Sequence, residues 1–344
     1  MLKKITPILI ISLGYMLPVF GQTVHKAEDM YKISHGSILH YNILPLKETV
    51  PDKDYSGLHN EANDIRIDTG AKIIVTSILL SKAADSAWYA AENALTEDKD
   101  YKSARQFYKT VLELQPDYYP ASIQIGKTFE QEENYEKAES AYKLALAKNF
   151  YDYQSHWDLA DAYHKDAKYD EAVNEITLAS ILNRNDTAIL SDMKEIYLDA
   201  HLSFGSWVFT PQYKISKAST SRDVNIMTKP DWEGYAVAKA IWKYEPGYAE
   251  SQGEKPGVNS YFEEKECLLN LLAGQDKHID AELEKHIEVL KKANELHLLD
   301  GFIYYEVLLP SNPALVYQLP TNVVRSMKNY VVLGHGGEAP KKKK

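Results

Sequence analysis

Residues 119–152 read YPASIQIGKTFEQEENYEKAESAYKLALAKNFYD, and residues 153–186 read YQSHWDLADAYHKDAKYDEAVNEITLASILNRND. Small side chains and aromatic rings recur at the same places in both stretches, and residues 85–118 show the pattern once more. A period of 34 residues predicts a stack of helix pairs, each of which buries its apolar face against its neighbour. Residues 187–200 carry only the first half of the pattern.

The pattern within each repeat follows the needs of close packing. Small residues at places 8, 20 and 27 let two helices approach, while large residues at places 4, 7, 11 and 24 fill the space beside them. The clearest departure is at place 8 of the first repeat, where Glu92 replaces a small residue. The fitting residues include Trp88, Ala91, Leu95, Ala104 and Tyr108, then Ile125, Gly126, Phe129, Ala138, Tyr142 and Ala145, then Leu159, Ala160, Tyr163, Ala172, Ile176 and Ala179.

This arrangement resembles the tetratricopeptide repeat (TPR) family over residues 85–200, about a third of the chain. The resemblance implies an all-α solenoid in which the first helix of each pair lines a concave groove. In that family the groove binds a protein or a peptide, and motif places 5, 9 and 12 point into it. The partner-binding residues that the resemblance implies are Tyr89, Asn93, Ile123, Lys127, Trp157, Asp161 and His164.

Two further points concern the groove. Tyr89, Ile123 and Trp157 would form an apolar stripe with polar flanks, as in peptide-binding sites. Some family members clamp a C-terminal carboxylate with a set of Lys, Asn and Arg residues, of which only Asn93 is present here, so that function is not implied. In an alternative arrangement, the chain's own terminal segments cover the stripe.

Composition excludes some classes of function. The chain has 344 residues, 44% of them hydrophobic, and a net charge of −10. This acidic balance argues against a nucleic-acid partner and is compatible with a basic peptide. A single cysteine excludes an intramolecular disulfide.

The N-terminus has the features of a secretory signal peptide. Lys3 and Lys4 precede a mostly apolar run, and Val19-Phe20-Gly21 supplies small residues before Gln22. We expect cleavage after residue 21 and export to the periplasm or the cell exterior, as in a bacterial envelope protein. The alternative is a retained membrane anchor, although the run is short and interrupted by prolines. No membrane span is expected after cleavage.

Outside the repeats the pattern is less regular. Residues 22–84 are interpreted as an N-terminal segment ending in a capping helix over 71–84, although that apolar run also fits a buried strand. Residues 201–229 are interpreted as an irregular connector. Residues 230–335 are expected to be helical, either continuing the solenoid or capping it, and 336–344 to be a disordered tail.

The sequence contains no Gly-rich phosphate loop, no G-x-S-x-G and no HExxH motif. Cys267 lies on an apolar helical stripe and is expected in the core. His278, Glu282 and His286 share a helix face, but their surroundings are rich in Glu and Lys and fit a solvated face better than a metal site. We therefore expect a scaffold protein without enzymatic activity, cofactor or metal.

A second hypothesis places a ligand-binding or catalytic site in the C-terminal helical region, with the repeats as a recruiting arm. Trp207, Trp232, Tyr235 and Trp242 would line this site. The alternative, that these aromatic residues belong to the core, is favoured. A cavity with converging carboxylates beside them would support the second hypothesis.

Overall fold

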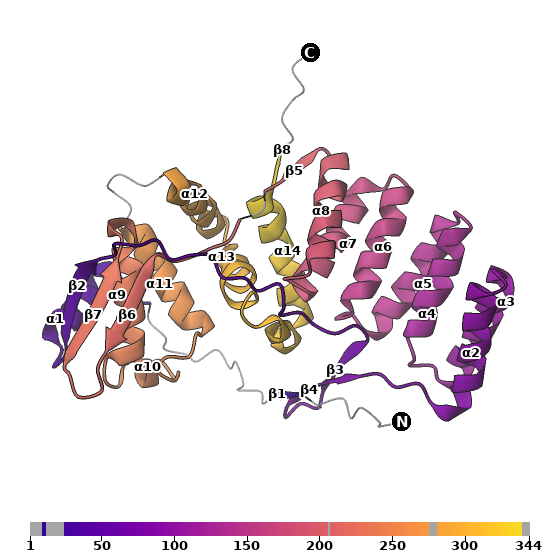
Figure 1. Ribbon diagram of the computed structural model, residues 1–344, viewed down its shortest axis with the longest axis horizontal. Helices are drawn as coiled ribbons and strands as arrows, with labels where there is room; N and C mark the ends of the chain where they lie inside the picture. Colours follow the sequence, from indigo (N-terminus) through magenta and orange to yellow (C-terminus); the bar gives the residue numbers. More distant parts are fainter. Residues whose placement is uncertain (1–8, 12–23, 206, 275–280, 339–344) are drawn as a thin grey trace, which may run out of the picture. The chain divides into compact units, whose positions relative to one another are not determined.

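The computed structural model describes residues 9–11, 24–205, 207–274 and 281–338 (Figure 1). The chain forms two compact units. The first contains residues 56–205 and 312–338 together with β1 (Leu9–Ile11), and the second contains residues 24–55 and 207–311. Each unit is therefore built from segments that are distant in the sequence.

The repeats form a row of helices in the first unit (Figure 1). Three helix pairs are followed by a single helix, and each first helix packs against the second helix of its own pair. Side-chain caps begin several of them: Asp152, for example, accepts a hydrogen bond from the backbone of Ser155. The helices are α2 (Lys82–Thr96), α3 (Tyr101–Leu114), α4 (Pro120–Gln131), α5 (Tyr135–Lys148), α6 (Tyr153–Lys165), α7 (Tyr169–Leu182) and α8 (Thr187–Asp199).

The turn inside each pair repeats with the same period. Lys99, Glu133 and Ala167 each follow a first helix and have φ of 52°, 56° and 55°. A left-handed residue at this place ends a helix and redirects the chain. His201, after α8, has φ of 61° at the same spacing. The last unit thus keeps the turn, although β5 (Leu202–Phe204) stands in place of a second helix.

Gly126 permits the close approach of α4 and α5. A Cβ atom at this position would lie 2.4 Å from Cε1 of the buried Tyr142. The first repeat has Glu92 at the place of this glycine. The hydroxyl of Tyr108 donates a 2.6 Å hydrogen bond to the Glu92 carboxylate. The glutamate that departs from the repeat pattern is therefore the partner of a buried tyrosine.

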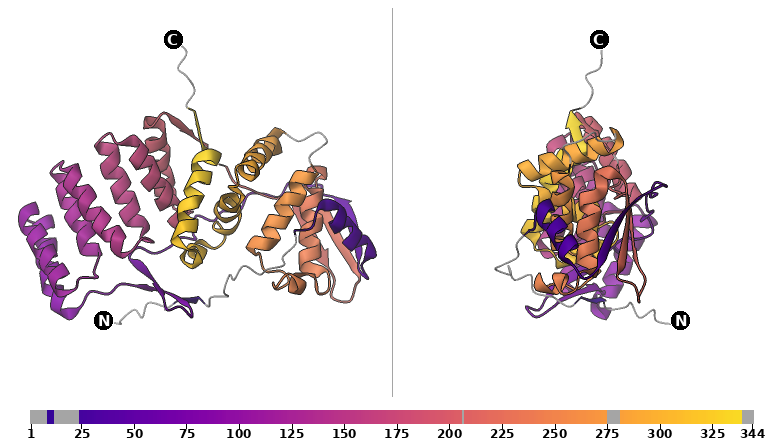
Figure 2. Two further views of the ribbon diagram at one scale, coloured as in Figure 1. Left: turned by 180° about the vertical axis from the view of Figure 1, so that it is seen from behind. Right: turned by 90° about the vertical axis from the view of Figure 1, so that its left-hand side faces the viewer.

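The last helix of the described chain returns to the repeats. After η3 (Pro313–Gln318), α14 (Thr321–His335) packs against α7 (Figure 2). As a result α7 has nine buried residues, whereas α5 has four. β8 (Gly336–Glu338) then pairs with β5, so the predicted disordered tail begins with a short strand.

A β-hairpin, not a capping helix, precedes the repeats. β3 (Asp64–Asp68) and β4 (Ile73–Ser77) pair antiparallel, and β1 pairs with the other edge of β4. The prediction of a helix over 71–84 is wrong because consecutive β-branched residues favour a strand. Arg66 of β3 donates a 2.7 Å hydrogen bond to the carbonyl of Tyr317, which ties the hairpin to η3.

A three-stranded sheet forms one layer of the second unit. β7 (Asp223–Thr228) is the central strand, with β2 (His40–Pro45) parallel on one side and β6 (Tyr213–Lys217) antiparallel on the other. The residues expected to form an irregular connector, 201–229, thus contain three strands. β7 alternates buried and less buried residues and packs against α9 (Glu233–Tyr244).

Helices complete the second unit. α1 (Ala27–Gly36) and α11 (Tyr261–Ala273) both pack against α9. The others are η1 (Pro230–Trp232), α10 (Tyr248–Ser251), α12 (Ala281–Glu295), α13 (Leu299–Phe302) and η2 (Ile303–Leu308). The predicted region 230–335 is therefore divided between the units after Ser311. The fold is mostly helical but not all-α, and among the described residues we find no helix with the length and apolar character needed to cross a membrane.

Candidate functional site

The first helices of neighbouring repeats are joined through their side chains. The indole nitrogen of Trp157 on α6 donates a 2.8 Å hydrogen bond to Asp192 of α8. His164, also on α6, has Nε2 2.7 Å from the carboxylate of Asp199. We call the surface formed by α2, α4, α6 and α8 the first-helix face; these contacts place Trp157 and His164 on it.

Ion pairs join α6 to α4 on this face. Nζ of Lys127 lies 3.1 Å from Asp158, and Nζ of Lys165 lies 2.5 Å from Glu130 and 2.6 Å from Asp161. Burial raises the pKa of the Asp158 carboxyl, and the positive charge of Lys127 opposes that rise. The side chains of the face are thus held in place by partners on adjacent repeats.

Negative charge dominates this linked set of side chains. It contains six carboxylates and two lysines, with His164 beside Asp199. A surface with this balance attracts basic segments and repels acidic ones. The carboxylates are those of Glu130, Asp158, Asp161, Asp192, Glu195 and Asp199, and the lysines are Lys127 and Lys165.

The predicted apolar stripe is not continuous. Tyr89 is 68% exposed, whereas Ile123 is 4% exposed and cannot contact a partner without rearrangement. The physical reason is that α4 packs against α3, α5 and α6, while α2 is the first helix of the row. Asn93 and Trp157 are half-buried. The prediction that Ile123 belongs to a partner-binding stripe is therefore corrected.

Near the C-terminal end of the chain, helix α14 packs against a second helix of the repeats, not against the first-helix face. α14 packs against α7, which is the second helix of its pair. Tyr151, at the turn before α6, donates a 2.5 Å hydrogen bond to the carbonyl of Leu319 in the same segment. The contacts of residues 312–338 thus include α7, this turn, the β3–β4 hairpin and β5.

Two groups of residues are candidates for binding a metal ion. The ligand atoms of His164, Glu195 and Asp199 lie within 4.8 Å of one another. The hydrogen bond joins His164 to Asp199, and Glu195 lies one turn before Asp199 on α8. Of the helix face considered in the sequence, His278 and the side chain of Glu282 lie outside the described residues. His286 stacks on Trp207 with ring centroids 4.6 Å apart.

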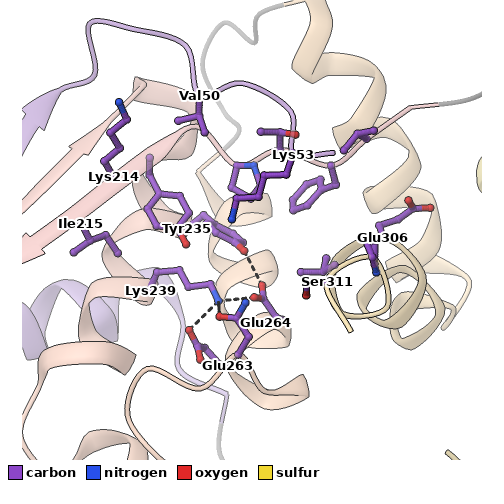
Figure 3. Close-up of a pocket in the computed structure, with 18 of the residues that line it drawn as sticks. Val50, Lys53, Lys214, Ile215, Tyr235, Lys239, Glu263, Glu264, Glu306 and Ser311 are labelled. Carbon is purple, nitrogen blue, oxygen red and sulfur yellow. Dashed lines mark hydrogen bonds and ion pairs between the residues drawn. The ribbon is translucent and has the colours of Figure 1, made fainter. Parts of the chain in front are cut away.

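The second unit contains a cavity of about 370 Å³, lined by β6, α9, α11 and nearby loops (Figure 3). Lys239 of α9 lies at its floor, with Nζ 2.8 Å from Glu263 and 2.5 Å from Glu264, both on α11. The hydroxyl of Tyr235 donates a 2.6 Å hydrogen bond to Glu264. We call Tyr235, Lys239, Glu263 and Glu264 the floor cluster; all four are buried.

Burial shifts the protonation of the floor cluster. It raises the pKa of the Glu263 carboxyl, and Lys239 opposes that rise. Burial also acts to lower the pKa of Lys239, but the nearby carboxylates outweigh it and the pKa is raised. Lys239 is therefore a charged lysine that depends on its two acidic partners.

Of the floor cluster, only Tyr235 is among the residues predicted from the sequence; Lys239, Glu263 and Glu264 are not. Lys239 interrupts the apolar face of α9, and that interruption is a usable signal, because a lysine on a buried face needs a buried partner. Glu263 and Glu264 give no comparable signal, since acidic residues are ordinary in the first turn of a helix. Cys267 is buried as expected, and burial raises the pKa of its thiol.

The four aromatic residues of the second hypothesis have different surroundings. Tyr235 lines the cavity described above, and Trp232 borders a smaller one of about 200 Å³. Trp242 is buried and its indole nitrogen donates a 2.6 Å hydrogen bond to Glu266. Trp207 contacts His286 and Phe302. Converging carboxylates thus accompany Tyr235, while Trp242 belongs to the core.

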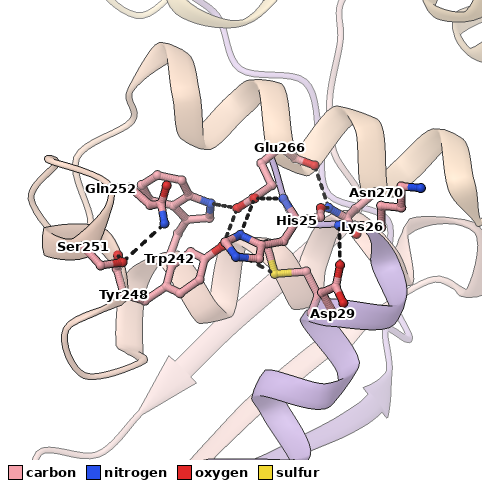
Figure 4. Close-up of polar contacts among 10 residues, drawn as sticks. His25, Lys26, Asp29, Trp242, Tyr248, Ser251, Gln252, Glu266 and Asn270 are labelled. Carbon is pink, nitrogen blue, oxygen red and sulfur yellow. Dashed lines mark hydrogen bonds and ion pairs between the residues drawn. The ribbon is translucent and has the colours of Figure 1, made fainter. Parts of the chain in front are cut away.

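Glu266 anchors the N-terminal segment of the second unit (Figure 4). Its carboxylate accepts hydrogen bonds from the backbone nitrogen of His25 at 2.5 Å and from the hydroxyl of Tyr248 at 2.8 Å. Asn270 donates to the carbonyl of His25 at 3.1 Å. These contacts fix the chain just before α1, so this buried carboxylate has a structural role.

Comparison with known proteins identifies the family of the repeats. Residues 95–150 match the family model of the tetratricopeptide repeat. No curated protein matches the chain. The following structures are similar at low sequence identity, and each corresponds to about a third of this chain.

One is the Yersinia enterocolitica type III secretion chaperone SycD in complex with a peptide of the translocator YopD, with 17% identity and a TM-score of 0.33, covering 35% of this chain and 96% of that chain. Another is the N-terminal domain of stress-induced protein-1 from C. elegans, with 16% identity and a TM-score of 0.31, covering 35% and 98%. A third is the Arabidopsis OM64 TPR domain, with 16% identity and a TM-score of 0.31, covering 33% and 94%.

Proposed function

Residues 95–150 match the tetratricopeptide repeat model, and we propose that the first-helix face of these repeats binds an extended, basic segment of another protein. The observation that carries the proposal is the linked set of side chains across α4, α6 and α8, in which carboxylates outnumber lysines. Charge complementarity of this kind selects partners and accelerates their association.

The fixed geometry of the face supports the same proposal. Trp157 and His164 are each held by a carboxylate on the next repeat. Side chains that are already ordered lose less conformational entropy when a partner binds. The exposed ring of Tyr89 offers an apolar contact at one end of the row, in place of the continuous stripe that the sequence predicts.

A peptide-binding experiment tests this proposal. A labelled peptide rich in Lys and Arg is titrated with the protein and followed by fluorescence anisotropy, beside a peptide of equal length rich in Asp and Glu. We expect the basic peptide alone to bind, with an affinity that falls as salt is added. Neutralising Asp161 and Asp199 together, as Asp161→Asn and Asp199→Asn, should weaken binding several-fold.

A matched control removes the same charge from a second helix. Asp170→Asn with Glu171→Gln changes two exposed acidic residues of α7 and should leave the affinity unchanged. If the acidic peptide binds equally well, or if both double variants weaken binding alike, the first-helix face is not the binding surface.

We further propose that the protein is exported and acts without catalysis. The support for export is the arrangement of Lys3 and Lys4 before an apolar run, with small residues ahead of Gln22. Expression with the native N-terminus in a Gram-negative host, followed by fractionation and mass spectrometry, tests it. A periplasmic or secreted protein that starts at Gln22 is expected, and an uncleaved cytoplasmic product would contradict export.

A further inference from the structure

We propose that the cavity of the second unit binds a small molecule with an anionic group at one end and hydroxyl or amino groups at the other. This site is separate from the protein-binding role of the first-helix face. The volume of about 370 Å³ lies within the range of ~300–1,000 Å³ that is usual for small-molecule sites. Its lining combines apolar side chains such as Phe209 and Ile215 with fixed polar groups, as such sites do.

The floor cluster is the part of the cavity that would bind hydroxyl or amino groups. Two carboxylates surround one ammonium group, so the ionised cluster carries one uncompensated negative charge. Burying an ion pair is costly, and an apolar replacement is often as stable, so stability alone does not explain this cluster. Hydroxyl or amino groups of a ligand would donate hydrogen bonds to Glu263 and Glu264, and a protonated amino group would also neutralise the excess negative charge.

Tyr213 adds a polar group to the same wall. It lines the cavity from β6, and its ring lies 5.6 Å from that of Tyr235. Its hydroxyl has no hydrogen-bond partner among the described residues. Asn259 also lines the cavity, with Oδ1 3.4 Å from Nζ of Lys239. The cavity thus offers both donors and acceptors.

Exposed lysines of the cavity would bind the anionic end of the ligand. Lys53, Lys214 and Lys243 line the cavity and are exposed; Figure 3 labels Lys53 and Lys214. Lys243 lies 5.2 Å from the ring of Tyr244, and none of the three forms an ion pair with the described residues. We call these three residues the lysine rim. Three exposed positive charges in the lining favour an anionic group, carboxylate or phosphate.

Calorimetric titration of the full chain tests the two ends separately. The probes are glucuronate, glutamate, glucose and inorganic phosphate, each at millimolar concentration. We expect glucuronate or glutamate to bind, and glucose and phosphate to bind more weakly because each matches one end alone. Which of the first two binds decides between hydroxyl and amino donors.

Substitutions in the cavity lining test whether the ligand binds there. Lys53→Gln with Lys214→Gln, at exposed positions that leave the fold intact, should weaken binding by at least about tenfold, the effect of one lost charge-assisted hydrogen bond. Lys217→Gln with Lys255→Gln removes two lysines of the same unit that do not line the cavity, and it should have no effect. Glu263→Gln tests the floor, with circular dichroism to verify folding.

Three results would overturn the proposal. The first is that neither glucuronate nor glutamate binds. The second is equal binding by the rim variant and its control. The third is that phosphate binds as tightly as the organic anions in both wild type and a folded Glu263→Gln variant, which would leave a simple anion site at the rim.

Discussion

The repeats and the second unit keep their charges in different places. In the repeats, buried positions are mostly Ala, Ile, Leu and Tyr, and an ion pair such as Lys165–Asp161 lies at the surface. In the second unit, Lys239, Glu263 and Glu264 are buried together. The difference teaches that the repeats are stabilised mainly by packing, whereas the second unit holds charges at a cost that function would explain.

The largest loss of stability is expected from removing the buried cation of the second unit. Lys239→Ala leaves Glu263 and Glu264 buried without their cation, and we expect it to lower the free energy of unfolding by about 3–5 kcal/mol. Chemical denaturation, followed by tryptophan fluorescence, measures this change. Lys243→Ala, on the exposed side of the same helix, is the control. Equal midpoints for the two variants would show that the buried cluster does not stabilise the unit.

Within the repeats, removal of a buried apolar side chain should have the largest effect. Leu178 belongs to α7, against which α14 packs, and is 7% exposed, whereas Leu144, at the same repeat place on α5, is 64% exposed. Leu178→Ala should lower the free energy of unfolding by about 2–4 kcal/mol, and Leu144→Ala by less than about 1 kcal/mol. Similar losses in the two variants would contradict the covering of α7 by α14.

Overpacking the same scaffold should have a somewhat smaller effect. Gly126→Val places side-chain atoms where the ring of Tyr142 lies, and we expect a loss of about 1–3 kcal/mol in the free energy of unfolding. Combining it with Tyr142→Leu should recover part of this loss, since the two residues contact each other. Additive losses in thermal or chemical denaturation would argue against that contact.

The smallest change in stability is expected at Asp152, an acidic residue that is buried within the repeats. Burial raises the pKa of Asp152, so its ionised form is less stable in the folded than in the unfolded chain. Asp152→Asn keeps an acceptor for Ser155 and should match wild type below about pH 4, the ordinary pKa of the group. As pH rises above that value, wild type loses this contribution and the variant should become more stable, by less than about 1 kcal/mol. Denaturation midpoints from pH 3 to pH 7 test this; a difference that shrinks with pH would contradict it.

The sequence predicts the repeats well because their information is local. Place by place, small and large residues report which helix surfaces meet, as Gly126 and Tyr142 show. Even the departure at Glu92 has a local partner, Tyr108. The face that these helices present could also be predicted, except for Ile123, whose burial depends on how neighbouring helices enclose α4.

The second unit could not be predicted in this way because its partners are distant. β2 pairs with β7 across a separation of 183 residues, and neither strand shows which partner it requires. The floor cluster likewise joins α9 to α11, and Lys239 alone gave a sign of it. Strand pairing and buried ion pairs depend on tertiary proximity, which periodicity does not report.

The return of α14 to α7 makes the first unit sensitive to the order of synthesis. A repeat stack ordinarily folds by adding neighbours, with contacts that are short in sequence. Here the last contact closes a loop that contains most of the second unit, and closing it costs chain entropy. Until residues 321–335 emerge from the ribosome, α7 lacks the helix that packs against it. The nascent chain therefore presents an apolar surface that a chaperone would recognise and that would otherwise promote aggregation.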